Sequence, residues 1–336
     1  MKALVWEAPR ALALRELERP RPAAGEVLVQ VAAVGICGSE LEGYLGENSL
    51  RRPPLVMGHE FCGVVVEHGP GVAGPALGTR VTVNPLYGCG ECERCRNGAN
   101  HLCGRRILVG AHRAGAFADF VAVPARVAHP LPEKTPDRLG ALCEPTAVCL
   151  HALRRAGFQA GERVAIWGAG ALGTIAAQVA LAHGAAEVSV LDTNPKRLEA
   201  ARQLGVHRPI NAAQASAGEL WPNAEDRPGI VLECVGRSVT RQAAARALAP
   251  GGRLILLGLH DVETPLPWNE LIRLEVSVLC SFAYAEQDFA RAVEFVAAGR
   301  LKAGDWLSTD VLASGPDWFQ RMTSGPVDVT KVVLTV

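Results

Sequence analysis

Hydrophobic and polar positions change their spacing partway along the 336-residue chain. In roughly the first 130 residues, short apolar runs are separated by Gly and Pro, which is typical of strands joined by loops. No long amphipathic helical pattern interrupts these runs before about Pro136. The first part is therefore expected to form a small, loop-rich β domain. Its strands are expected at Lys2–Trp6, Glu26–Val34, Gly63–Glu67, Arg80–Val83 and Ala118–Val123.

From about Gly161 onward, apolar strand-type runs alternate with helical patterns. Alternation of this kind predicts a parallel, doubly wound sheet, and therefore the α/β fold class. Strands are expected at Arg163–Trp167, Glu187–Asp192, Ile230–Cys234, Arg253–Leu257 and Val276–Cys280. Helices are expected at Ala171–His183, Pro195–Leu204 and Ser238–Leu248.

The chain ends with a helical pattern, Gln287–Ala298, and a short apolar run, Lys331–Val336. This run has no neighbouring strand pattern to pair with, so it is expected to return to the first domain. The expected domains are 1–145 for the first part of the β domain, 146–285 for the doubly wound domain, and 286–336 for the second part of the β domain.

Composition and charge narrow the classes of partner. Basic and acidic residues balance at 34 each, so no large field attracts nucleic acid or anionic lipid. Aromatic residues make up only 5% of the chain, which leaves few side chains for stacking on bases. We therefore expect no nucleic-acid partner.

A membrane partner is not expected either. The start, Met1–Arg10, carries Lys2 and Glu7 and lacks the apolar core of a secretory signal. The segment Val164–Ala186 is uncharged and long enough to span a bilayer, but it contains several glycines and begins as a strand and turn. These observations favour a cytoplasmic protein.

A glycine-rich turn predicts a dinucleotide site. Gly168, Gly170 and Gly173 directly follow an apolar strand and, with Ala171 and Leu172, open a helix. The first glycine permits the tight turn, the second lets the backbone approach a pyrophosphate, and the third allows close helix–strand packing. The helix N-terminus then offers N–H groups to the phosphates.

Asp192 ends the next strand, nineteen residues after Gly173, where an acidic residue binds the ribose hydroxyls of NAD. A carboxylate there repels a 2′-phosphate, so NAD is favoured over NADP. Arg197 is expected to flank the adenine, and only an NADP alternative would use it to bind the 2′-phosphate. The structural alternative is that Asp192 caps the helix Pro195–Leu204.

Four of the ten cysteines fall within fifteen residues: Cys89, Cys92, Cys95 and Cys103. In a chain without an export signal, four thiolates at such short spacing indicate a closed structural zinc site in a lobe over residues 88–104. The alternative of four free surface thiols is unfavourable because thiols grouped in one loop are prone to oxidation.

A second set of potential ligands is dispersed: Cys37, His59, Glu60 and Glu144. One Cys, one His and one carboxylate would leave an exchangeable position on a zinc ion, as catalysis requires. Each residue taken alone is more often structural, and spacing alone does not select them.

Several motifs resemble the medium-chain dehydrogenase/reductase family. Gly58-His59-Glu60-x2-Gly63-x5-Gly69-x2-Val72 is similar to the zinc signature of that family, and Cys37-Gly38-Ser39 and Glu144-Pro145 occur in the family's order. The presence of Glu144 resembles the polyol (sorbitol-like) and threonine dehydrogenase branch most closely. The resemblance implies a GroES-like, mainly-β catalytic domain in two sequence pieces around a central NAD-binding Rossmann domain. It also implies two zinc ions per subunit, one catalytic and one structural.

The resemblance also implies residue roles. Cys37 and His59 are the firm ligands of the catalytic zinc, and the third is either Glu60 or Glu144, with Glu144 slightly favoured in the resting state. Ser39 takes the proton of the substrate hydroxyl. The family commonly has Asp and His where this chain has Glu40 and Glu42. The usual final proton acceptor is therefore missing, and either Glu42 or bulk water is expected to replace it.

The substrate remains open at this level. We expect an enzyme that oxidises a small-molecule secondary alcohol, polyol or sugar alcohol with NAD. A threonine-like 3-dehydrogenase or a sugar-phosphate dehydrogenase is the alternative. A non-catalytic NAD-binding protein is disfavoured because the candidate ligands are all present. Arg51 and Arg52 are interpreted as solvated surface arginines rather than as contacts to an anionic substrate. Family habit implies a homotetramer or homodimer.

Overall fold

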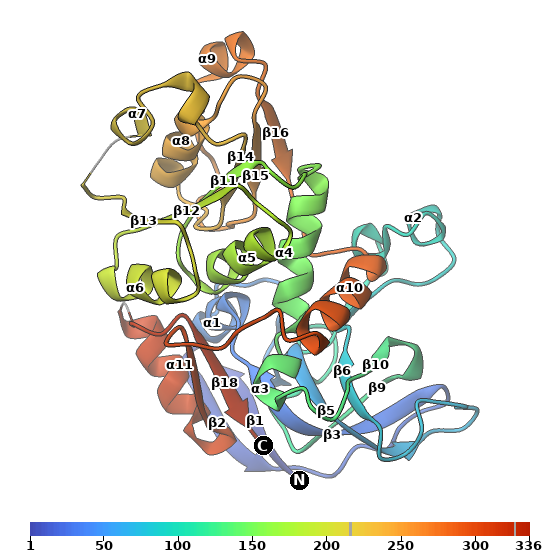
Figure 1. Ribbon diagram of the computed structural model, residues 1–336. Helices are drawn as coiled ribbons and strands as arrows, with labels where there is room; N and C mark the ends of the chain where they lie inside the picture. Colours follow the sequence, from blue (N-terminus) through green and yellow to red (C-terminus); the bar gives the residue numbers. More distant parts are fainter. Residues whose placement is uncertain (215–216, 326) are drawn as a thin grey trace. The chain divides into compact units, whose positions relative to one another are not determined.

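A computed structural model describes residues 1–214, 217–325 and 327–336 (Figure 1). The chain folds into two compact units. The first unit comprises Met1–Glu144, Ala285–Gly299 and Leu307–Val336. The second comprises Pro145–Tyr284 and Arg300–Trp306.

The first unit is mainly β. Its strands are β1 (Lys2–Ala8), β2 (Ala11–Glu16), β3 (Glu26–Gly35), β4 (Leu55–Val56), β5 (Glu60–His68), β6 (Arg80–Val83), β7 (Leu86–Tyr87), β8 (Ile107–Leu108), β9 (Phe120–Pro124), β10 (Ala128–Pro130), β17 (Leu307–Val311) and β18 (Lys331–Thr335). Its helices are α1 (Gly38–Leu45), α2 (Glu93–Arg96), α3 (Asp137–Gly140), α10 (Glu286–Ala297) and α11 (Gly315–Ser324). Helix α4 (Cys143–Arg155) begins in this unit and continues into the second.

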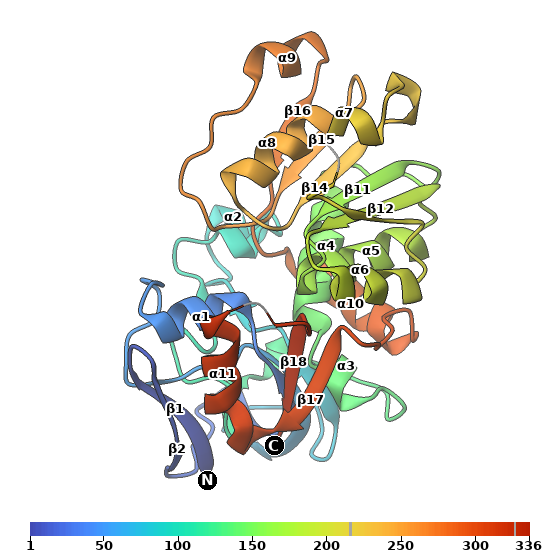
Figure 2. The same ribbon diagram turned by 90° about the vertical axis from the view of Figure 1, so that its left-hand side faces the viewer.

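The main sheet of this unit has the order β10-β6-β5-β3-β18-β17, with β9 also pairing with β3. β18 runs antiparallel to β3, with Val333 opposite Gly35. The prediction that the apolar C-terminal run returns to the first domain is therefore confirmed. Figure 1 labels the red strand β18 and the blue strand β3, which belong to this sheet, and Figure 2 shows β18 beside β17.

An aromatic cluster packs against helix α1 of the first unit. The ring of Tyr44, in α1, meets that of Phe319, in α11, at a centroid distance of 5.5 Å in an edge-on arrangement. Phe117 meets Phe319 at 5.7 Å, also edge-on. All three rings are buried, so α1 rests on a rigid apolar base.

The second unit is a doubly wound parallel sheet with the order β13-β12-β11-β14-β15-β16. Its strands are β11 (Arg163–Trp167), β12 (Glu187–Asp192), β13 (Arg208–Asn211), β14 (Ile230–Glu233), β15 (Arg253–Leu256) and β16 (Ser277–Cys280). Its helices are α5 (Ala171–Ala182), α6 (Pro195–Gln203), α7 (Ala217–Leu220), α8 (Ser238–Ala247) and α9 (Trp268–Arg273). The chain reverses its direction of winding between β11 and β14, and sheets of this kind bind ligands beside that point, at the carboxyl ends of the strands.

The expected α/β fold class is confirmed, but one segment lies elsewhere than expected. The third sequence piece was expected to belong wholly to the β domain, whereas Arg300–Trp306 belongs to the second unit. The backbone N–H of Lys302 donates to Oε1 of Gln178 at 2.7 Å, and the indole of Trp306 is buried. These contacts fix the segment against the second unit.

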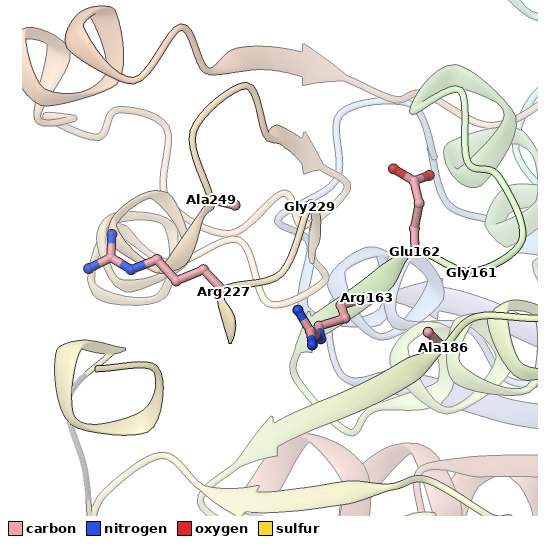
Figure 3. Close-up of a pocket in the computed structure, with 7 residues that line it drawn as sticks. All are labelled: Gly161, Glu162, Arg163, Ala186, Arg227, Gly229 and Ala249. Atoms are coloured by element: carbon pink, nitrogen blue, oxygen red, sulfur yellow. The ribbon is translucent and has the colours of Figure 1, made fainter. Parts of the chain in front are cut away.

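One surface pocket of about 400 Å³ lies at the amino ends of the parallel strands, whereas the glycine-rich turn lies at their carboxyl ends (Figure 3). It is lined by residues at the amino ends of the strands, including Arg163, the first residue of β11, and Gly229, immediately before β14. The side chains of Glu162 and Arg227 point in different directions in Figure 3, so they do not converge on a common centre. Among the described residues, no helix combines the length and hydropathy needed to cross a membrane.

Candidate metal centres and dinucleotide site

The four clustered cysteines meet in one loop of the first unit. Their sulfur atoms all lie within 4.8 Å of one another, and none forms a disulfide. The measured sulfur–sulfur distances are 3.6 Å for Cys89–Cys103, 3.7 Å for Cys92–Cys103 and 3.9 Å for Cys89–Cys95. A zinc ion with Zn–S distances of about 2.3 Å sets sulfur–sulfur distances of about 3.8 Å in a regular tetrahedron. The cluster therefore fits a closed zinc site.

The surroundings in this loop favour the thiolate of Cys89 and disfavour that of Cys95. Backbone N–H groups of Glu91 and Cys92 lower the pKa of Cys89 to about 6. Desolvation raises the pKa of Cys95 to about 11. The guanidinium of Arg105 lies 3.3 Å from the sulfur of Cys89, which adds a positive charge beside the cluster.

A second group of metal-type donors forms where β3 ends and β5 begins. The donor atoms of Cys37, His59 and Glu60 lie within 4.8 Å of one another. The antiparallel pairing of the two strands places Gly35 opposite Glu60, which brings the residues after β3 next to the residues before β5. The sequence-predicted ligand Glu144 lies in the first turn of the long helix α4 and is not a member of this group.

A carboxylate from the core of the unit holds His59. Nδ1 of His59 lies 2.7 Å from Oε1 of Glu40, which also accepts the backbone N–H of Gly58 at 2.8 Å. The other oxygen of Glu40 accepts the N–H of Cys37 at 3.0 Å. Burial opposes the charge on Glu40, yet its pKa is lowered because His59 and Arg51 lie near it. The contact leaves Nε2 of His59 available to a metal, the arrangement that metal-binding histidines commonly have.

Glu60 has a buried cationic partner, Lys331, which sequence reasoning missed. Their side chains are 1% and 2% exposed and form an ion pair, and Nζ of Lys331 also donates to the carbonyl of Ile36 at 2.9 Å. Burial disfavours the charged lysine, but the carboxylate of Glu60 and the thiol of Cys37 raise its pKa. No signal in the linear sequence marks this lysine as buried, because lysine is usually exposed.

Ser39 lies beside the second donor group. Its hydroxyl donates to the sulfur of Cys37 at 3.5 Å. Glu42 lies one turn further along α1, where its carboxylate accepts a hydrogen bond from Nδ2 of Asn48 at 3.4 Å. Arg51 is 4% exposed and hydrogen-bonded to Ser39, so the interpretation of Arg51 as a solvated surface residue is wrong, whereas Arg52 is exposed.

The glycine-rich turn has the geometry that the sequence predicted. Gly168 has φ +98°, a value that only glycine adopts without strain. A Cβ on Gly173 would lie 1.8 Å from the carbonyl oxygen of Gly168, so helix α5 packs directly on the turn. A Cβ on Gly170 would meet no protein atom within 4 Å. Protein packing therefore does not require glycine at this position, whereas close approach of a phosphate would.

Asp192 joins the turn to the next strand. Its Oδ2 accepts the N–H of Ala169 at 2.7 Å, and its Oδ1 accepts the N–H of Asn194 at 2.8 Å. The cap of helix α6 is Asn194, whose side chain accepts the N–H groups of Lys196 and Arg197. The alternative in which Asp192 serves as the helix cap is therefore wrong.

A buried ion pair links two further loops at the carboxyl ends of the parallel strands. Sequence reasoning missed it. Glu233 is fully buried and accepts N–H bonds from Val235 and Gly236. Arg241 lies 3.9 Å from Glu233 and donates to the carbonyl of Gly258 at 3.0 Å. The loops that follow β14 and β15 are thus held together beside the glycine-rich turn.

Two family models match the chain. Residues 23–133 match the alcohol dehydrogenase GroES-like domain, and residues 171–298 match the zinc-binding dehydrogenase model. The 2-dehydro-3-deoxy-L-galactonate 5-dehydrogenase of Pseudoalteromonas atlantica is 34% identical over 316 residues, which is 93% of this chain and 92% of that protein.

Two solved structures resemble the whole chain. A zinc-binding dehydrogenase from Sinorhizobium meliloti, bound to NADP, superposes with a TM-score of 0.93 at 31% identity, covering 100% of this chain and 99% of that one. The alcohol dehydrogenase RspB from Escherichia coli, in complex with NADH, superposes with a TM-score of 0.93 at 29% identity and the same coverage.

Proposed function

The chain belongs to the zinc-dependent medium-chain dehydrogenase/reductase family, and from this premise we propose that it oxidises a secondary alcohol, polyol or sugar alcohol to the ketone with NAD. Membership makes it an enzyme of the zinc-type alcohol dehydrogenase class that uses zinc and a nicotinamide dinucleotide. The observation that carries the proposal is the meeting of Cys37, His59 and Glu60 beside Ser39.

Cys37 and His59 are proposed to hold the catalytic zinc, with a carboxylate from Glu60 or Glu144 as the third ligand. A thiolate, an imidazole and a carboxylate suit zinc and leave a position for exchange. When bound, zinc acts as a Lewis acid that makes the substrate hydroxyl more acidic. The ion pair with Lys331 already compensates the charge of Glu60. This pairing supports Glu144 as the resting ligand and Glu60 as the exchangeable one.

Of the remaining residues, Glu40 orients His59, and Ser39 and Glu42 are proposed to transfer the proton. Glu40 fixes the ring of His59 through Nδ1, and this supports coordination through Nε2. Ser39 is proposed to receive the hydroxyl proton of the substrate. Glu42 is proposed to pass that proton to solvent. We expect Glu42→Gln to alter the pH–rate profile of oxidation, and a profile identical to that of the parent would eliminate Glu42 from this route.

The thiolate cluster is proposed to hold a structural zinc ion through Cys89, Cys92, Cys95 and Cys103. A site closed by four thiolates has no free position for substrate, so its role is to fold the lobe over residues 88–104. None of the ten cysteines forms a disulfide in the structure, which fits a reducing compartment and supports the proposed cytoplasmic location.

NAD is proposed as the preferred dinucleotide. Gly168, Gly170 and Gly173, with Ala171 and Leu172 in the first turn of α5, would receive the pyrophosphate at the helix N-terminus. Asp192 would accept hydrogen bonds from the adenosine ribose and repel a 2′-phosphate, and Arg197 would flank the adenine. The family accommodates both dinucleotides, because one similar structure contains NADP and another contains NADH.

A homo-oligomer is proposed as the working form, either a dimer or a tetramer. Strand β16 forms one edge of the parallel sheet in the second unit. Large apolar side chains in the same unit are exposed, including Val262 at 98%, Ile272 at 70% and Trp268 at 55%. An unpaired strand edge and exposed apolar side chains support association with a second copy.

A substrate screen with metal analysis tests the proposal. The purified protein is mixed with NAD and, separately, with polyols, secondary alcohols, threonine, sugar phosphates and sugar acids, and NADH formation is followed by absorbance. Sugar acids are included because of the relative from Pseudoalteromonas atlantica. We expect two zinc ions per chain and oxidation of a neutral polyol or secondary alcohol. A zinc-loaded protein that reduces NAD with none of these classes would refute the proposal, and preference for threonine would favour the alternative.

A further inference from the structure

Arg51 is a buried cation in contact with the proposed catalytic serine. Its Nη1 donates to the carbonyl oxygen of Ser39 at 2.9 Å, and its Nη2 donates to the hydroxyl oxygen of Ser39 at 3.3 Å. Its Nε donates to the carbonyl oxygen of Gly110 at 3.2 Å. One planar group therefore joins the start of α1 to the loop that contains Gly110.

Burying a guanidinium is unfavourable unless hydrogen bonds and nearby charges compensate it. Among the described residues, no carboxylate forms an ion pair with Arg51, and its hydrogen bonds are accepted by three neutral oxygens. The buried carboxylate of Glu40 is close enough for Arg51 to lower its pKa. The cation is thus held mainly by neutral groups, two of which belong to one residue.

The chain also makes room for this arginine. A Cβ on Gly43 would lie 2.8 Å from Cδ of Arg51, so a larger residue at that position of α1 would collide with the arginine stem. Gly43 is itself buried in the middle of a helix, where glycine is intrinsically unfavourable. The small residue and the buried arginine therefore form a matched pair.

We propose that Arg51 is a positioning residue that holds Ser39 for proton removal from the alcohol. Its two bonds to Ser39 fix both the backbone and the hydroxyl oxygen, and its charge lies beside the oxygen that receives the proton. This inference rests on the proposed function. It goes further because it assigns Arg51 to the catalytic machinery rather than to the recognition of an anionic substrate.

The chemistry balances without any further reactant. The substrate hydroxyl gives its proton to the oxygen of Ser39 while the proton of Ser39 leaves toward solvent. The carbinol carbon gives its hydride to NAD, which becomes NADH, and the ketone forms. A hydroxyl oxygen has two lone pairs, so Ser39 can accept from Arg51 and still accept the substrate proton.

Kinetics of Arg51→Met, Ser39→Ala and the double variant test the proposal, with Arg52→Met as the matched control because Arg52 is adjacent and exposed. We expect Arg51→Met to lower kcat about 10–100-fold with little change in KM, because a hydrogen bond to a charged group is lost near the reacting atoms. In the Ser39→Ala background the same change is expected to have almost no further effect. Multiplicative losses in the double variant would overturn the proposal.

Measurements other than activity separate positioning from simple damage. Zinc content and NADH binding, followed by fluorescence, are expected to match the parent in Arg51→Met. If that variant fails to fold, Arg51→Lys replaces it, because lysine keeps the charge but cannot donate in the same fork. We expect Arg51→Lys to lower kcat less, and only when Ser39 is present; kcat equal to that of the parent would refute the role.

Failure of the proposed function would look different. In that case the parent itself would oxidise no alcohol, whereas failure of the Arg51 proposal leaves an active parent in which Arg51→Met either has no effect or acts independently of Ser39→Ala. Thermal unfolding of the parent, Arg51→Met, Ser39→Ala and the double variant checks the contact independently of catalysis. Coupled losses are expected for Arg51 and Ser39, and additive losses would show that the two side chains act separately.

Discussion

Replacing Lys331 with methionine would leave the buried carboxylate of Glu60 without its cationic partner and lower the free energy of unfolding. The two side chains form an ion pair at 2% and 1% exposure, so water cannot screen either charge. Removing one member of such a pair leaves a buried charge without compensation, which costs about 3–5 kcal/mol. The methionine keeps most of the apolar stem, so lost packing contributes little to the difference.

The double variant Glu60→Gln, Lys331→Met provides the decisive comparison. With both charges removed, the site holds a neutral amide and an apolar chain, and replacement of a buried pair by uncharged groups is often neutral. We therefore expect Lys331→Met to lower the free energy of unfolding by about 3–5 kcal/mol and the double variant to recover most of that loss. Equilibrium unfolding of the metal-free protein in urea, followed by circular dichroism, measures both.

The pH dependence follows from the direction of the pKa shift. The pKa of Lys331 in the folded protein is raised above 10.5, so the folded state binds the proton more tightly than the unfolded state. The stabilisation is thus fully present below 10.5 and is lost as the pH rises through the folded value. A loss of less than about 1 kcal/mol in Lys331→Met at neutral pH, or additive losses in the double variant, would refute the reasoning.

Three further predictions concern ligands and cofactor. Asp192→Ala is expected to raise KM for NAD about 10–100-fold and to reduce the preference for NAD over NADP. Initial rates with both dinucleotides measure these changes. Glu144→Gln is expected to reduce the zinc content of the metal-loaded protein more than Glu60→Gln does, and equal or reversed losses would assign the third ligand to Glu60. Arg241→Met is expected to weaken NADH binding in a fluorescence titration, whereas Arg246→Met, on the exposed face of the same helix, should bind NADH like the parent.

The regular elements of the second unit were predictable from the sequence because buried parallel strands give continuous apolar runs. β11 and β12 have the predicted bounds, and the glycine turn follows directly after β11. The 13-residue helix α4 was not predicted. Its first turn contains Glu144 and Pro145, which were interpreted as a domain junction and a ligand motif.

The charged residues around the second donor group could not be predicted in the same way. Lysine and arginine are usually solvated, so nothing in the sequence indicates that Lys331 and Arg51 are buried. The burial of Lys331 depends on strand pairing across 295 positions, and the burial of Arg51 depends on tertiary contacts with Ser39 and Gly110. The contact between Glu40 and His59 likewise depends on the register of β3 and β5, which a linear pattern does not specify.

The separation of β3 and β18 along the chain imposes an order on how the first unit is assembled. Lys331 contacts Ile36 across 295 positions, and the entire second unit is synthesised between them. During translation, the sheet therefore remains without β18 while the intervening domain leaves the ribosome and folds. Cys37, His59 and Glu60 are already outside the ribosome during that interval, whereas the ammonium group that neutralises Glu60 arrives last. A newly made chain without β18 would therefore carry the charge of Glu60 without its ammonium partner, and the arrival of the last strand would neutralise it.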